Sequence, residues 1–274
     1  MSAPTQQPGP DARRRHPDMS TTTRTTPRAS VPDARRVGGL AAANARLLVR
    51  NRLTLVDGVL LPLAPLVMLA VTADEPAAGA STVSLALLFA YLFPVFYNLL
   101  SVVVTRRDEL VLKRLRTGET TDAELVLALA LPGVVVAVLV AAVVVPVAVA
   151  LGMPWPADLA LYALMVVTAC VMFVAFALWT ASWTRNAEAA QLTSAPVLLL
   201  AVAGSVVALV PEGVAEVLQR TPGGALDTLV QLAWLGGGAD GTWAQALQPL
   251  LVLLAWTALA LLLAQRSMRW EPRA

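Results

Sequence analysis

The sequence is poor in the residues that most enzyme sites need. Its 274 residues include one cysteine, Cys170, one histidine, His16, and one lysine, Lys113. A single cysteine excludes an internal disulfide and a cysteine-based metal cluster. A single histidine excludes the His-Glu-x-x-His signature of zinc proteases, and the Gly-x-Ser-x-Gly turn of serine hydrolases does not occur. The phosphate loop Gly-x-x-x-x-Gly-Lys-Ser/Thr is missing too, because the glycine nearest Lys113, Gly118, follows it. We expect no catalytic residue, cofactor or metal site in this chain.

Charge is scarce as well. Only 14% of the residues are charged, whereas a soluble domain is about one quarter charged. Hydrophobic residues make up 57% of the chain, and the mean hydropathy is +0.69. So much apolar surface does not fit into one water-soluble core, and lipid is the expected solvent. The predicted fold class is therefore an all-α integral membrane protein.

The first 36 residues have a different composition from the rest. They are rich in Pro, Thr and Arg, have no apolar period and contain no apolar run of the signal-peptide kind. We expect residues 1–36 to be a disordered cytoplasmic tail and residues 37–270 to be the membrane domain. Met1 and Met19 are both open as start residues. The arginines of the tail accompany no folded reader of nucleic acid, so we expect no nucleic-acid partner.

Six segments have the length and apolar character that a spanning helix needs, roughly 20 residues. They are Leu53–Thr72, Thr82–Val104, Leu125–Leu151, Leu159–Ser182, Gln191–Val210 and Leu247–Ala264.

Lysine and arginine give the orientation of these spans. The chain up to Arg52 holds ten, the segment Arg106–Glu124 five, the loop after the fourth span one, and the C-terminal end three. These regions alternate onto one side, and only Arg220 lies on the other, a ratio of 19 to 1. Both termini are therefore expected in the cytoplasm.

Two cytoplasmic segments outside the spans have helical patterns. In residues 37–52, Leu40, Leu47 and Leu48 share one helical face, which favours a helix lying in the head-group layer over a simple extension of the first span. Arg106–Glu124 holds five basic and five acidic residues together with leucines, which fits a docking surface for another protein better than a membrane anchor. Its end, Thr121-Asp122-Ala123-Glu124, has the pattern of a capping box that opens the third span.

The long loop on the opposite side, Pro211–Ala246, contains two short apolar pieces that cannot span. We expect short helices on or dipping into the outer leaflet, separated at Gly223-Gly224, with Trp234 and Trp243 at the interface. Within the spans, Asp57 has two open interpretations, a local ion pair and a mechanistic role. Phe93, Tyr97 and Asn98 are candidate substrate-path residues, and packing between helices is the alternative for all three.

The segment between the second and third spans resembles the cytoplasmic loop of type-2 ABC-transporter permeases. That family shows an acidic residue, a Lys/Arg-Leu-Arg cluster and a Thr or Ser, matched here by Glu109, Lys113-Arg114-Leu115-Arg116 and Thr117. The resemblance extends over about residues 37–270, since the six spans, the interfacial helix and the broken loop before the last span are similar too.

The resemblance implies that this segment is a coupling helix for a separate ABC ATPase subunit, present in two copies and carrying ATP and Mg²⁺. It also implies a second, homo- or heterodimeric permease chain, and a second contact in the loop after the fourth span. The implied coupling residues are Asp108, Glu109, Lys113, Arg114, Leu115, Arg116, Thr117, Arg185 and Glu188.

The predicted function is a permease subunit of an ATP-driven exporter in the bacterial plasma membrane. Its substrate is expected to be apolar or amphipathic, such as a drug, secondary metabolite or lipid, because the expected spans contain almost no charge. An ion-coupled transporter and a non-transporting membrane scaffold are the alternatives. A membrane enzyme is disfavoured because Asp57 has no acidic partner in the expected spans.

Overall fold

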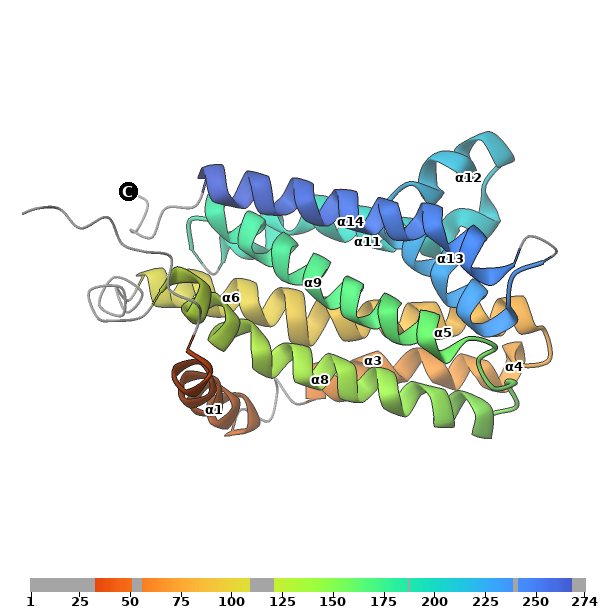
Figure 1. Ribbon diagram of the computed structural model, residues 1–274, viewed down its shortest axis with the longest axis horizontal. Helices are drawn as coiled ribbons and strands as arrows, with labels where there is room; N and C mark the ends of the chain where they lie inside the picture. The colour runs from red at the N-terminus through yellow and green to blue at the C-terminus, as the bar shows by residue number, and fades with distance from the viewer. Residues whose placement is uncertain (1–32, 51–55, 109–120, 187, 239–240, 268–274) are drawn as a thin grey trace, which may run out of the picture. The chain divides into compact units, whose positions relative to one another are not determined.

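The computed structural model describes residues 33–50, 56–108, 121–186, 188–238 and 241–267, which belong to one compact unit, Pro32–Ala274. Every regular element in these ranges is helical (Figure 1). In chain order they are α1 (Ala34–Arg50), η1 (Val56–Leu60), α3 (Leu61–Leu63), η2 (Ala64–Met68), α4 (Leu69–Thr72), α5 (Pro76–Tyr91), η3 (Leu92–Tyr97), α6 (Asn98–Asp108), α8 (Asp122–Ala150), α9 (Leu159–Trp183), α10 (Ala189–Thr193), α11 (Ala195–Val202), η4 (Ala203–Leu209), α12 (Glu212–Gln219), α13 (Pro222–Leu235) and α14 (Thr242–Ser267). The all-helical prediction is confirmed.

Within the described residues, four helices are long and apolar enough to cross a membrane. They are Pro76–Arg107, Ala123–Ala150, Leu159–Trp183 and Thr242–Ser267, and they coincide with the second, third, fourth and sixth predicted spans. The other two predicted spans correspond to the shorter apolar helices Gly58–Thr72 and Ala195–Val207. Both shorter helices are irregular: the first mixes π, α and 3₁₀ turns, and the second passes from α to 3₁₀. Six spans therefore remain a prediction, whereas four are supported by length.

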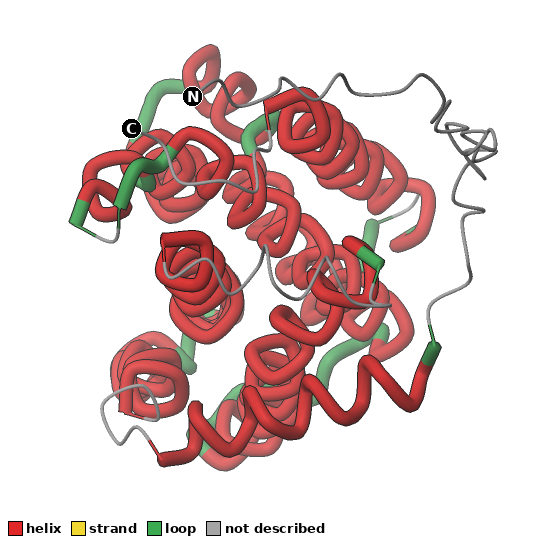
Figure 2. The backbone as a smooth tube through the Cα atoms, turned by 90° about the vertical axis from the view of Figure 1, so that its left-hand side faces the viewer, coloured by secondary structure: helices red, strands yellow, loops and turns green. Residues whose placement is uncertain are grey.

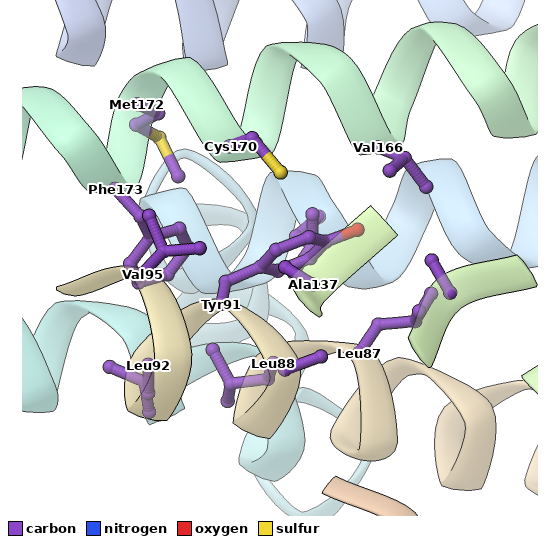
Figure 3. Close-up of a cluster of buried hydrophobic side chains, with 14 of the residues drawn as sticks. Leu87, Leu88, Tyr91, Leu92, Val95, Ala137, Val166, Cys170, Met172 and Phe173 are labelled. Carbon is purple, nitrogen blue, oxygen red and sulfur yellow. The ribbon is translucent and has the colours of Figure 1, made fainter. Parts of the chain in front are cut away.

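Helix α9 lies at the centre of the hydrophobic core. It contacts α14, α13, α8 and the rod formed by α5, η3 and α6. Tyr91 stacks on Phe173 with ring centroids 5.7 Å apart, and Cys170 is buried beside them. Figure 3 shows these side chains of α9 meeting those of α5, η3 and α8. A helix that is buried on most of its surface is apolar nearly all round, and the sequence of α9 accordingly has no polar face.

The rod from α5 to α6 changes its winding at Pro94. Proline has no N–H to donate and its ring collides with the preceding turn, so the wider π turn of η3 accommodates it. Helix α8 crosses this point with Gly133, where a Cβ atom would lie 1.9 Å from the carbonyl oxygen of Pro94. Only glycine permits this approach, which brings α8 directly against the backbone of η3.

Helix α1 runs across the ends of the long helices instead of continuing one of them. Figure 2 shows it lying side-on where other helices are seen along their axes. It packs on α8, with Ala41 buried. It begins at Ala34, so residues 34–36, which we expected in the tail, are helical. A transverse amphipathic helix fits the predicted head-group position better than an extension of the first span.

Helix α13 is buried in the bundle, and two sequence predictions for it are wrong. Gly223 and Gly224 do not separate helices; they lie in the first turn of α13, which Thr221 caps and Pro222 opens. Trp234 is not an interface residue. It is 1% exposed, donates from Nε1 to the carbonyl of Pro154 at 2.9 Å, and packs edge-on to Tyr162. Apolar contacts with α5, α9 and α14 draw this helix inward. The second predicted interface tryptophan, Trp243, is half exposed.

Glycines let α13 approach the shorter helix formed by α11 and η4. A Cβ atom on Gly223 would lie 2.0 Å from the carbonyl oxygen of Ala201, and one on Gly204 would lie 2.2 Å from the carbonyl oxygen of Gly223. The neighbouring atoms are backbone atoms, so neither helix can yield by turning a side chain. The two backbones are therefore in direct contact.

We predict that Gly223→Ala lowers the free energy of unfolding by about 2 kcal/mol or more, because the added methyl group forces the two backbones apart. The matched control is Gly213→Ala in α12, where a Cβ atom meets nothing within 4 Å. That control should be neutral or stabilising by up to about 1 kcal/mol. Thermal unfolding of both variants in detergent measures the difference, and equal midpoints would contradict the close contact.

Candidate functional site

Several helix ends and the transverse helix α1 meet at one end of the bundle, which we call the α1 end (Figure 1). Helices α6, α9 and α14 finish there, and α8 begins there. The chain between α6 and α8, residues 109–120, lies outside the described residues. So do the predicted coupling residues Glu109, Lys113, Arg114, Leu115, Arg116 and Thr117, and the side chain of Asp108. The structure does describe the two helix ends that carry this segment.

Arg107 joins the end of α6 to the end of α9. Its side chain is only 1% exposed, and its guanidinium donates to three backbone carbonyls, those of Ala181, Thr184 and Arg185. The last carbonyls of a helix have no partner within the helix and carry the negative end of the helix dipole. A planar cation with several donors suits them well. Arg107, directly before the first predicted coupling residue Asp108, thus closes the helix that leads into the second predicted contact.

Glu124 closes two helix starts at once. Thr121 and Glu124 form the predicted capping box: the Glu124 carboxylate accepts from the Thr121 N–H at 2.8 Å, and Thr121 Oγ1 accepts from the Glu124 N–H at 3.2 Å. The other carboxylate oxygen accepts from the N–H of Asp33, directly before α1, at 2.7 Å. The start of α8 is therefore tied to the start of α1.

A second polar link holds α1 near its middle. Asn44 donates its amide N–H to the carbonyl of Ala128 in α8 at 3.0 Å, and its amide oxygen accepts from Arg106. Arg106 and Arg107, neighbours at the end of α6, thus contact α1 and α9 respectively. The two adjacent cations thus couple the end of α6 to two other helices, α1 and α9.

The loop after α9 carries the second pair of predicted coupling residues. Arg185 and Glu188 are exposed, as a contact for another protein requires. Hydrogen bonds hold residues next to these two. Thr184 and Thr193 share a hydrogen bond of 2.8 Å, and Asn186 accepts from the N–H of Ala189 at 2.8 Å. Their side chains therefore stand on a fixed backbone.

The three predicted path residues do not face one way. Phe93 and Tyr97 pack together with ring centroids 5.9 Å apart, and the Tyr97 hydroxyl accepts from Ser194 at the start of α11, at 3.4 Å. Asn98 instead lies beside Gly133 of α8. All three are half-buried. The side chains of Phe93 and Tyr97 thus have different neighbours from the side chain of Asn98. Asp57, the other intramembrane candidate, lies in η1, and its side chain is outside the described part.

Comparison with known families decides the class of the chain. The profile described as "ABC-2 type transporter" matches residues 37–212, from α1 to the start of α12. The chain belongs to the ABC-2 type transporter family. A search among curated proteins finds no match. An ABC-2 membrane domain is a multi-pass membrane permease and not a catalytic domain, and it works with an ABC ATPase.

Sequence reasoning missed the role of Arg107, the most buried charged side chain described at the α1 end. The sequence places Arg107 among the charges that orient the spans and within the predicted docking segment, but it does not predict a helix cap there. The available signal was its place within one turn of a long apolar run, where a cation must find partners as the helix enters the protein. The contact between Glu124 and Asp33 had no signal, because it joins residues 91 positions apart.

We predict that Arg107→Gln lowers the free energy of unfolding by about 3 kcal/mol, because carbonyls at the end of α9 lose a charged donor while remaining buried. Arg107→Lys should lie between Gln and wild type, since an ammonium group keeps the charge without the planar fork. Arg185→Gln is the control: only its backbone is used, so its effect should stay within about 0.5 kcal/mol. Thermal unfolding in detergent compares the three, and an Arg107→Gln midpoint equal to that of the control would contradict the assignment.

Proposed function

We propose that the chain is the permease subunit of an ATP-driven ABC exporter and that the segment between α6 and α8 docks on the ATPase. The family match carries the proposal. The described ends of that segment support it, because Arg107 and Glu124 tie them to α9 and α1. A push on the segment would therefore reach α6 and α8 and, through Arg107 and Glu124, also α9 and α1.

The loop at Arg185 and Glu188 is the second proposed ATPase contact. Arg107 donates to the carbonyls of Thr184 and Arg185, so the start of this loop is joined to the end of α6. One ATPase subunit could then move α6 and α9 together. The predicted coupling residues in the segment itself, Glu109 and Lys113 to Thr117, complete the proposed surface.

The proposed topology has six spans with both termini in the cytoplasm. The distribution of basic residues supports it, since 19 of the 20 lie in chain segments that would be on the α1 side and only Arg220 lies on the other. The shorter helices Gly58–Thr72 and Ala195–Val207 are the proposed first and fifth spans. Helix α1 would lie in the cytoplasmic head-group layer, and two permease chains would assemble with two ATPase chains.

The proposed cargo is an apolar or amphipathic molecule that leaves the cytoplasm or the inner leaflet. The four long spans are almost free of charge in their interiors, which suits such a cargo. An ion-coupled transporter would have several ionisable groups near the membrane centre. A scaffold would share the architecture and bind the ATPase without moving a substrate.

The first experiment is a mild-detergent purification of the tagged chain from its native membrane, with identification of the proteins that accompany it. A stoichiometric subunit that carries a phosphate loop is the expected result. Purification without any ATPase, even after crosslinking, would sink the ABC proposal and favour the ion-coupled alternative. ATPase binding without ATP-dependent transport would favour the scaffold.

We predict that Glu109→Ala and Arg114→Glu each uncouple ATP hydrolysis from transport, with at least a tenfold loss of ATP-driven transport, while the chain still inserts normally. The reason is that both side chains lie on the proposed docking segment, where a lost or reversed charge breaks the mechanical contact. Transport and ATP hydrolysis are measured together in reconstituted vesicles.

Arg266→Glu is the matched control. It makes the same charge reversal on an exposed side chain at the end of α14, outside the proposed contact. Transport by this variant should stay near the wild-type rate. Wild-type transport by both segment variants would leave the segment with no role beyond orienting the spans.

A further inference from the structure

An acidic side chain is buried at the end of the bundle opposite α1. Asp227 of α13 is 8% exposed. The Gln231 amide donates to its carboxylate at 2.9 Å, and the hydroxyl of Ser84 in α5 is a second hydrogen-bond partner. Both partners are neutral. Among the described residues no ion pair of Asp227 occurs, so dipoles surround its carboxyl group and no opposite charge lies beside it.

Asp227 also lines a cavity. The cavity has a volume of about 270 Å³ and opens between η4, α12 and α13. Asp227, Thr228 and Gln231 form its polar wall together with Gln219 of α12, and Val207 and Leu235 are among its apolar residues. None of the described lining residues is basic. The site therefore combines one carboxylate, several neutral hydrogen-bonding groups and an apolar wall.

Burying the Asp227 carboxylate without an opposite charge in the described part of the cavity costs free energy. Burial in apolar surroundings disfavours a charged group unless an opposite charge accompanies it. Burial accordingly raises the pKa of the Asp227 carboxyl, which the hydrogen bonds from Ser84 and Gln231 offset only in part. A cation in the cavity would remove that imbalance.

The lining selects the kind of cation. A metal ion needs several oxygen or nitrogen ligands, and no group of three or more His, Cys, Asp or Glu residues occurs within the described ranges. An organic ammonium group needs a single counter-charge and tolerates apolar neighbours. The volume is sufficient for a head group but small for a whole drug-sized molecule.

We propose that this cavity binds the cationic head group of an amphipathic substrate, with the Asp227 carboxylate as its counter-ion. The inference rests on the proposed function for its role in export, because it names the substrate class: amphipathic organic cations. The apolar wall at Val207 and Leu235 would hold the first part of the tail. Since α13 packs against both α5 and η4, a bound head group would contact the element that lies between the second and fifth proposed spans.

The test is equilibrium dialysis of the purified chain, in neutral dodecyl maltoside micelles, against radiolabelled benzyltrimethylammonium. Binding to empty micelles is subtracted. Wild type should bind the cation saturably, and Asp227→Asn should bind it at least tenfold more weakly, because asparagine keeps the shape and loses the charge. Ser84→Ala is the matched control. It removes one hydrogen bond to the Asp227 carboxylate but keeps the charge, so it should change the affinity for the cation less than about threefold.

A structural role of Asp227 predicts a different result. Asparagine can still accept from Ser84 and Gln231, so a purely structural Asp227→Asn variant would bind the cation as wild type does, and that outcome overturns the proposal. Absence of saturable binding to the wild type overturns it as well. The thermal midpoint of each variant, measured alongside, shows whether lost binding reflects lost folding.

A second measurement needs no variant. Dicyclohexylcarbodiimide modifies buried protonated carboxyl groups, and peptide mapping by mass spectrometry distinguishes Asp227 from other acids. Benzyltrimethylammonium should protect Asp227 from modification, and unchanged labelling at saturating cation would overturn the proposal. Both assays use the permease chain without an ATPase. The binding site can therefore fail while an ATPase still co-purifies, and it can stand when none does.

Discussion

The architecture of the α1 end depends on one constraint: backbone groups at buried helix ends must find partners inside the protein. Two side chains meet this constraint at the α1 end, and each serves more than one helix. Arg107, on α6, supplies donors to the last carbonyls of α9. Glu124, in the first turn of α8, accepts from the N–H groups that precede both α8 and α1. Cation and anion are thus placed at a helix C-terminus and helix N-termini, where the dipoles favour them.

The same contacts set the mechanical properties of that end. A helix end that is closed by a neighbouring helix cannot move without moving the neighbour, unless buried hydrogen bonds to a charged group are broken, at a cost of about 1.5–3 kcal/mol each. Helices α6, α8, α9 and α1 are linked in this way, and Ser182 and Ser267 add α14 through a hydrogen bond of 2.6 Å. The proposed ATPase contacts lie between these linked ends. This bonding pattern favours movement of the linked ends together over bending of one helix alone.

Local and compositional signals predicted much of this structure. Long apolar runs gave the four long helices to within a few residues at most ends, and Thr121 to Glu124 gave the start of α8, because a capping box is encoded within four residues. The environment of α13 was not predictable. Its sequence is apolar but too short to span, and its burial depends on glycines in two helices, Gly204 and Gly223, meeting in space. Arg107 was recognised as a charge but not as a cap, since its partners follow 74 to 78 residues later.

The shorter apolar helix Ala195–Val207 and buried α13 depend on one another. Ala195–Val207 has only 13 residues, fewer than the roughly 20 that cross the hydrocarbon layer as an α-helix. Its 3₁₀ part, η4, lengthens the rise per residue, and α13 packs against it with backbone in contact with backbone. Irregular backbone at such a depth requires cover by protein, and α13 provides that cover. Because α13 is needed there as a packing element, its polar face at Asp227 and Gln231 is brought inside as well, and the result is a buried carboxyl group that has no ion pair within the described ranges.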